Sequence, residues 1–152
     1  MKDLKFVIQE LEKHRERLLY SKNKIETWEK LDGETLNSPE NVETIDSFIF
    51  RFCKMQDAMG EKLFPLTLQF LGEEVRNKPF IDILNRLERL EILDSAETWK
   101  KLREIKNFLT HVYPWETEET IEYIKIALSY TNILIDIYEK FKKVLKGRGI
   151  AI

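Results

Sequence analysis

The sequence predicts an all-α protein that folds as an antiparallel, up-and-down bundle of four or five helices. Apolar residues recur at three- and four-residue spacing along most of the 152 residues. Five glycines and four prolines are few for this length, so the segments between breaks are long, as helices require and short strands do not. The length fits one ordinary domain. We therefore expect residues 1–152 to form a single helical domain.

The first helix and the start of the second follow from local signals. The first helix is predicted from Asp3 to about Trp28, with one apolar face formed by Leu4, Val7, Ile8, Leu11, Leu18 and Leu19. The segment 31–38 is polar and contains an Asp-Gly pair, so a loop is expected there. A second helix should begin at Pro39, because Ser38 is a favourable N-cap and proline fits the first helical position.

The second helix is strongly amphipathic and should reach Leu71. We expect a kink at Pro65, where the backbone lacks a hydrogen-bond donor, and an end at Gly72. Pro79 should open a third, shorter helix. Its expected apolar positions are Phe80, Ile83, Leu84, Leu87, Leu90 and Ile92.

A fourth helix should follow, with Ser95 as its N-cap. It should end by Tyr113, because Pro114 disfavours helical geometry in the residue before it. The last helix is predicted from Thr117 to about Lys146. Its apolar residues cover so broad an arc that it needs neighbours on two sides. The bundle interior and a dimer partner would both serve.

The composition excludes several classes of function. Lysine and arginine number 25 against 27 aspartate and glutamate, so no global basic field attracts nucleic acid and any contact with RNA must be local. A single cysteine, Cys53, and two histidines form no zinc pattern and no intramolecular disulfide. We expect no metal, no other cofactor, and a small buried side chain at Cys53. Without an apolar signal core or a segment long enough to cross a membrane, the protein is expected in the cytoplasm.

The segment 102–116 is where the sequence places candidate chemistry. On a helix, Asn107 and His111 share one face, with Lys106 beside them and Arg103 one turn earlier. Next to a phosphodiester, a cation would neutralise charge that develops on phosphorus, while His111 would move a proton to or from a ribose 2′-hydroxyl or a leaving oxygen. Spacing alone does not separate this chemistry from an ordinary histidine near a helix end.

Two segments of the chain resemble the HEPN superfamily, and within it the HepT-like toxins that are encoded beside minimal nucleotidyltransferases. They are KNFLTHVYPWE at 106–116 and SFIFRFCKMQDAMGEKLF at 47–64. Asn107, His111 and Tyr113 match the family motif, and Lys106 stands at the position of its arginine. The similarity follows the whole chain in helix order, but its specific part is short.

The resemblance implies a homodimer in which both copies of the motif face one composite cleft. It further implies metal-independent cleavage of RNA, with His111 as acid and base, Lys106 or Arg103 as phosphate clamp, and Asn107 orienting the scissile group. A cognate minimal nucleotidyltransferase would act as the antitoxin. Tyr113 would be the residue that such a partner adenylylates.

Position 106 departs from the family pattern. An arginine grips phosphate with a planar fork, whereas a lysine provides a point charge. Arg103 lies closer to the start of the helix, but seven residues separate it from His111, more than the family allows. Arg51 and Asp57, on the second predicted helix, line the cleft, pair with the motif, or are solvated charges on a helix face.

Three functions stay open at this point. The first is the ribonuclease toxin of a toxin–antitoxin pair. The second is a non-enzymatic module that binds a nucleotidyltransferase and presents a substrate to it, and Lys106 gives weight to this alternative. The third is a structural dimer with an inert motif.

Overall fold

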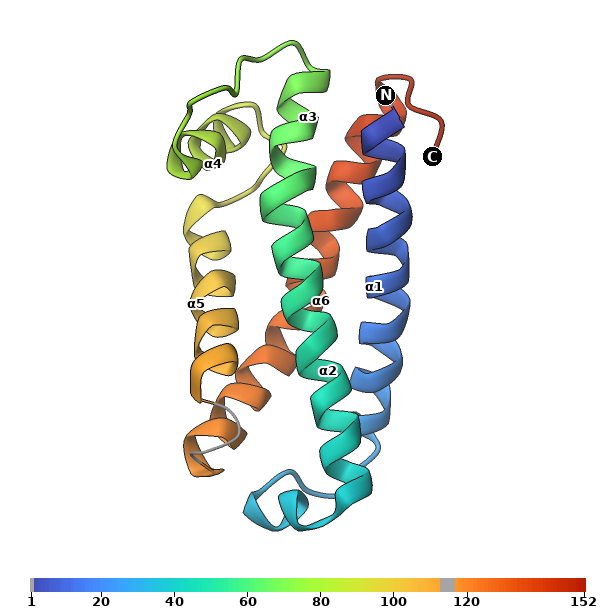
Figure 1. Ribbon diagram of the computed structural model, residues 1–152, viewed down its shortest axis with the longest axis vertical. Helices are drawn as coiled ribbons and strands as arrows, with labels where there is room; N and C mark the ends of the chain where they lie inside the picture. Colours follow the sequence, from blue (N-terminus) through green and yellow to red (C-terminus); the bar gives the residue numbers. More distant parts are fainter. Residues whose placement is uncertain (1, 113–116) are drawn as a thin grey trace.

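The computed structural model describes residues 2–112 and 117–152, and in this part of the chain it is all-helical, which confirms the predicted fold class. Four long segments run up and down: α1 (Lys2–Glu26), α2 (Pro39–Ala58) with its continuation α3 (Phe64–Phe70), α5 (Ala96–Val112) and α6 (Thr117–Gly147). The short helix α4 (Phe80–Arg89) lies across one end (Figure 1).

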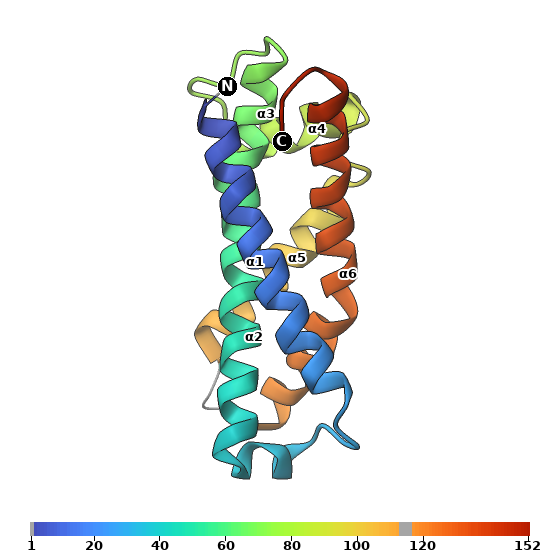
Figure 2. The same ribbon diagram turned by 90° about the vertical axis from the view of Figure 1, so that its right-hand side faces the viewer.

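The long helices form a square arrangement. In Figure 1, α2 lies in front, between α5 and α1, and α6 runs behind it. Figure 2 looks onto α1 and shows α2 and α6 on its two sides, with α5 behind. Both termini lie at the same end of the bundle. No helix in the described part of the chain is long and apolar enough to cross a membrane.

Two helices start where their caps predict. The hydroxyl of Ser38 accepts a hydrogen bond from the backbone N–H of Asn41 at 3.4 Å, and Pro39 is the first residue of α2. The hydroxyl of Ser95 accepts from the N–H of Thr98 at 3.1 Å, directly before α5. These local signals mark where α2 and α5 begin.

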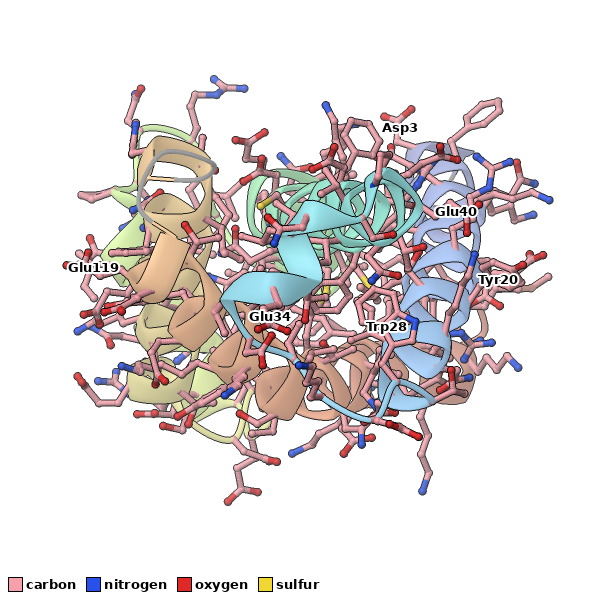
Figure 3. The ribbon with its side chains drawn as sticks, turned by 90° about the horizontal axis from the view of Figure 1, so that it is seen from below. Asp3, Tyr20, Trp28, Glu34, Glu40 and Glu119 are labelled. Atoms are coloured by element: carbon pink, nitrogen blue, oxygen red, sulfur yellow. The ribbon has the colours of Figure 1, made fainter. Side chains whose placement is uncertain are left out.

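The segment 31–38 is more ordered than the predicted loop. It contains a 3₁₀ helix, Gly33–Asn37, whose N-cap is Asp32. The carboxylate of Asp32 accepts from the backbone N–H groups of Glu34 and Thr35, and the Thr35 hydroxyl accepts from the N–H of Asp32. This turn crosses the lower end of the bundle, where Glu34 is labelled in Figure 3.

The predicted kink at Pro65 is instead a π-helical turn, Met59–Leu63, placed just before the proline. Its wider winding is closed by the N–H of Phe64, which donates to the carbonyl of Met59. Gly60 lies in this turn, and a Cβ atom there would stand 3.2 Å from Cζ2 of Trp99. The indole of α5 therefore packs directly against the backbone of the π turn.

The third helix is shorter than its apolar pattern suggested. It ends at Arg89, so Leu90 lies outside it and is exposed, while Ile92 is buried from the turn that follows. The remaining apolar stripes point inward and form one core. At its upper part the ring of Phe64 lies 4.5 Å from that of Trp99 and 4.7 Å from that of Phe141, measured between centroids. These rings join α3, α5 and α6.

Candidate functional site

Helix α5 carries the candidate motif as one row. Because residues four apart are neighbours on a helix, Arg103, Asn107 and His111 follow one another along its exposed side. All three side chains are exposed. The sequence had predicted this shared face. Tyr113, the proposed modification site, lies outside the described residues.

Lys106 belongs to the same helix but has a partner on α2. Its ammonium group lies 3.0 Å from a carboxylate oxygen of Asp57, with side chains that are 22% and 38% exposed. This is one of the placements that the sequence left open for Asp57. The pair neutralises the cation at the position of the family arginine. It also joins α5 to α2 at mid-height.

Arg103, unlike Lys106, has no carboxylate partner among the described residues. Its guanidinium lies over the ring of Phe80, 5.1 Å from the centroid. No described carboxylate lies within ion-pair distance of it. Its planar fork is therefore available to an anion.

Arg51 lies on the other side of α2, toward α1, and contacts a histidine that the sequence had not singled out. It donates from Nη1 to Nδ1 of His14 at 3.0 Å, and Nε2 of His14 lies 3.2 Å from Glu10. Because an arginine can only donate, Nδ1 is the acceptor and Nε2 carries the proton. Burial lowers the pKa of His14, and Arg51 and Lys54 add to the effect. The i, i+4 pair of Glu10 and His14 was the available signal in the sequence.

A second feature that sequence reasoning missed surrounds Phe50, whose side chain is half exposed. The cations of Arg51 and Lys54 lie 5.0 and 5.6 Å from the centre of its ring. Arg17 of α1 is close enough to Arg51 to lower its pKa further, after the larger effect of burial. We call Arg17, Phe50, Arg51 and Lys54 the basic–aromatic cluster. None of its three cations forms an ion pair with a described carboxylate.

The cluster and the motif lie at similar heights. Asp57 contacts Lys106, and one turn lower Sγ of Cys53 lies 3.9 Å from the hydroxyl of Thr110. Since α2 and α5 are antiparallel, the next turn down brings Phe50 level with the lower end of α5, just past His111.

Cys53, on the side of α2 that faces α5, is partly buried. Burial raises the pKa of its thiol to about 11, so the group is protonated and weakly reactive at neutral pH. This agrees with the predicted small packing side chain. In the described residues, no three histidine, cysteine, aspartate or glutamate side chains gather as metal ligands do.

Comparison of the chain with protein-family models, with curated proteins and with solved structures finds no match. The resemblance to HEPN proteins therefore stays a prediction that rests on the motif residues. What the structure adds is the arrangement of α5, the Lys106–Asp57 pair and the basic–aromatic cluster.

Proposed function

We propose that this chain is a HepT-like ribonuclease of the HEPN type, the toxin of a toxin–antitoxin pair, which cleaves RNA at a cleft between two copies. The single observation that carries the proposal is the exposed row Arg103, Asn107 and His111, with the cations of the basic–aromatic cluster, none of which forms an ion pair with a described carboxylate, at the level of its lower end. Cations and exposed aromatic rings in one area suit a single strand with phosphates and unstacked bases.

The reaction needs a base, an acid and a clamp. One His111 removes the proton of the ribose 2′-hydroxyl, whose oxygen attacks phosphorus and displaces the 5′-oxygen of the next nucleotide. The His111 of the second copy donates the proton that the leaving oxygen takes up, so the products are a 2′,3′-cyclic phosphate and a 5′-hydroxyl. Arg103 holds the phosphate oxygens as charge builds, and Asn107 orients the group.

Arg103 suits the clamp better than Lys106 does. The ammonium of Lys106 already faces the carboxylate of Asp57, which would repel an incoming phosphate. The guanidinium of Arg103 lies over the ring of Phe80 and forms no ion pair with a described carboxylate. The assignment shifts the clamp by almost one helical turn from the family position.

Incubation of the pure protein with single-stranded RNA tests the proposal. We expect His111→Ala to lower the cleavage rate by about 10²- to 10⁴-fold. Arg103→Ala should reduce it more than Lys106→Ala, because the fork supports the phosphate directly. Lys101→Ala, on the same helix but outside the row, is the matched control and should cleave at the wild-type rate. If His111→Ala and wild type cleave equally, the proposal is wrong.

The Lys106–Asp57 pair favours a second candidate, a non-enzymatic module that binds a nucleotidyltransferase. A neutralised cation at the motif removes part of the charge that phosphate binding needs. This candidate predicts no cleavage by wild type or by Asp57→Asn, which frees Lys106. It also predicts a stable complex with a nucleotidyltransferase encoded beside the chain, measurable by size-exclusion chromatography.

A further inference from the structure

A row of exposed side chains runs along the outside of α1. Residues three and four apart are neighbours on a helix, and Lys13, Arg17, Tyr20 and Lys24 follow this spacing. All four are exposed, and Tyr20 is 72% exposed. Figure 3 shows Tyr20 on the outer side of α1. This side of α1 therefore presents three cations and an aromatic ring to solvent.

The row is continuous with the basic–aromatic cluster. Arg17 belongs to both, and it lies close enough to Arg51 of α2 to lower the pKa of that guanidinium, after the larger effect of burial. One shallow hollow is lined by residues of both helices, among them Arg17, Tyr20 and Arg51. Beyond Arg51, the ring of Phe50 has the cations of Arg51 and Lys54 at 5.0 and 5.6 Å from its centre. We call the following residues the α1–α2 face: Lys13, Arg17, Tyr20, Lys24, Phe50, Arg51 and Lys54.

The α1–α2 face has a local excess of positive charge, although the chain as a whole has a net charge of -2. None of its cations forms an ion pair with a carboxylate in the described part of the chain. Glu16, which lines the same hollow, and Glu43 and Asp46, which precede Phe50 on α2, are exposed acids at its edges. The cations outnumber them. An extended anion that contacts several of these cations at once is attracted to this face.

We infer that the α1–α2 face binds single-stranded nucleic acid. The cations contact phosphates, while Tyr20 and Phe50 stack on unpaired bases, a combination that holds single strands without reading their sequence. Neither contact involves the ribose 2′-hydroxyl, so DNA binds as RNA does. Arg51 is held for this role by its hydrogen bond to Nδ1 of buried His14, at 3.0 Å.

Binding of a strand to this face is independent of the proposed nuclease. Its consequence for cleavage rests on the proposed function: the face would hold the part of a long RNA that extends beyond His111. Loss of the face should then raise the KM of a long RNA and leave its kcat unchanged.

Fluorescence anisotropy with a labelled oligothymidylate of about twelve nucleotides tests the inference. This DNA has no 2′-hydroxyl to attack phosphorus, so a failure of binding here is separate from a failure of cleavage. We expect a Kd between about 1 and 100 µM at physiological salt, as for other binding that does not depend on sequence. The logarithm of the affinity should fall with the logarithm of salt concentration by about 0.7 for each phosphate that is neutralised.

Variants on α1 separate the contribution of charge from that of the rings. Lys13→Gln combined with Arg17→Gln should reduce this salt slope by about 1.4, because two phosphate contacts are lost. Lys143→Gln combined with Lys146→Gln is the charge-matched control, since both lysines are exposed on α6 outside the face. It should keep the wild-type slope. Tyr20→Ala should weaken binding by about 5- to 150-fold and leave the slope unchanged, because stacking releases no counterions.

Glu16→Gln should act in the opposite direction. It removes an acid from the hollow, so oligothymidylate should bind more tightly, by up to about fivefold. A damaged fold does not produce such a gain. Weaker or unchanged binding by this variant would contradict the inference.

Two further probes decide the class of partner. A DNA duplex hides its bases, so Tyr20→Ala should leave its binding unchanged. Polyglutamate of similar length has charge but no bases, and it should bind at least about tenfold more weakly than oligothymidylate. Equal binding of the two single chains would assign the face to an acidic protein instead. That result overturns the inference, as do a lack of oligothymidylate binding and equal salt slopes for the α1 variant and its α6 control.

Discussion

The two sides of α2 are built differently. Toward α1 the polar side chains form a connected network: Arg51 donates to His14, His14 contacts Glu10, and Lys62 returns from the π turn to Glu10 at 2.9 Å. Toward α5 the described residues provide one ion pair, a cavity and an indole N–H without an acceptor. Satisfied networks fix a structure, whereas a buried polar group without a partner is costly. The difference suggests that the buried contacts of His14 on the α1 side serve stability and that the α5 side serves function, with Arg51 belonging both to the network and to the basic–aromatic cluster.

Substitution in the aromatic cluster of Phe64, Trp99 and Phe141 should have the largest effect on stability. Phe64 is fully buried and packs between Trp99 of α5 and Phe141 of α6. Phe64→Ala should lower the free energy of unfolding by about 3 to 5 kcal/mol, because the removed ring leaves a cavity. Urea denaturation measures it. The matched control is Phe50→Ala, whose half-exposed ring should cost much less. Equal losses in the two variants would show that the α5 side does not depend on this cluster.

A direct comparison of the two sides replaces one cation on each side by methionine. Arg51→Met leaves Nδ1 of buried His14 without its donor and should cost about 1 to 3 kcal/mol. Lys106→Met removes a partly exposed ion pair with Asp57 and should cost less than about 1 kcal/mol.

Arg51→Met also removes the repulsion between Arg17 and Arg51, which partly offsets its loss of stability. Urea denaturation should therefore be run at moderate salt, where that repulsion is screened. A larger loss for Lys106→Met than for Arg51→Met would reverse the comparison.

Local signals in the sequence were enough to predict where α2 and α5 begin. Ser38 with Pro39, and Ser95, act on backbone groups within three residues, so their caps could be read without knowing the fold. The π turn could not be predicted in this way. Trp99, which is distant in sequence, packs against the backbone of this turn at Gly60, and local signals do not reveal such a contact. Pro65 indicated that the helix is irregular here, but it did not indicate a π turn.

The candidate site likewise has a part that the sequence predicts and a part that depends on how the helices pack. The row on α5 follows from helical periodicity, which the sequence contains. The partners of Arg51 and Asp57 depend on how helices pack: His14 lies 37 residues from Arg51 in sequence, and periodicity assigns Arg51 a face of α2 but not the neighbour that it meets. The same holds for the basic–aromatic cluster, because Arg17 and Phe50 come from different helices.

The pH dependence of stability should differ between variants of His14 and His111, and this effect should be smaller than those of the substitutions above. Burial lowers the pKa of His14 below its ordinary value of 6.5. The unfolded chain therefore binds a proton at a pH where folded His14 stays neutral, so the free energy of unfolding falls as the pH drops through 6.5 and levels off below the folded pKa. One proton gives a slope of at most about 1.4 kcal/mol per pH unit. Glu10, Arg51 and Lys54 are the charged groups that act on it.

His14→Gln should flatten this slope between pH 7 and 5, because a glutamine can accept from Arg51 and donate to Glu10 without titrating. His111→Gln, at the exposed position on α5, should keep the wild-type slope. Urea denaturation at several pH values gives both. If His111→Gln flattens the curve and His14→Gln does not, the titrating network lies on the α5 side, and the assignment of stability to one side of α2 and function to the other has to be exchanged.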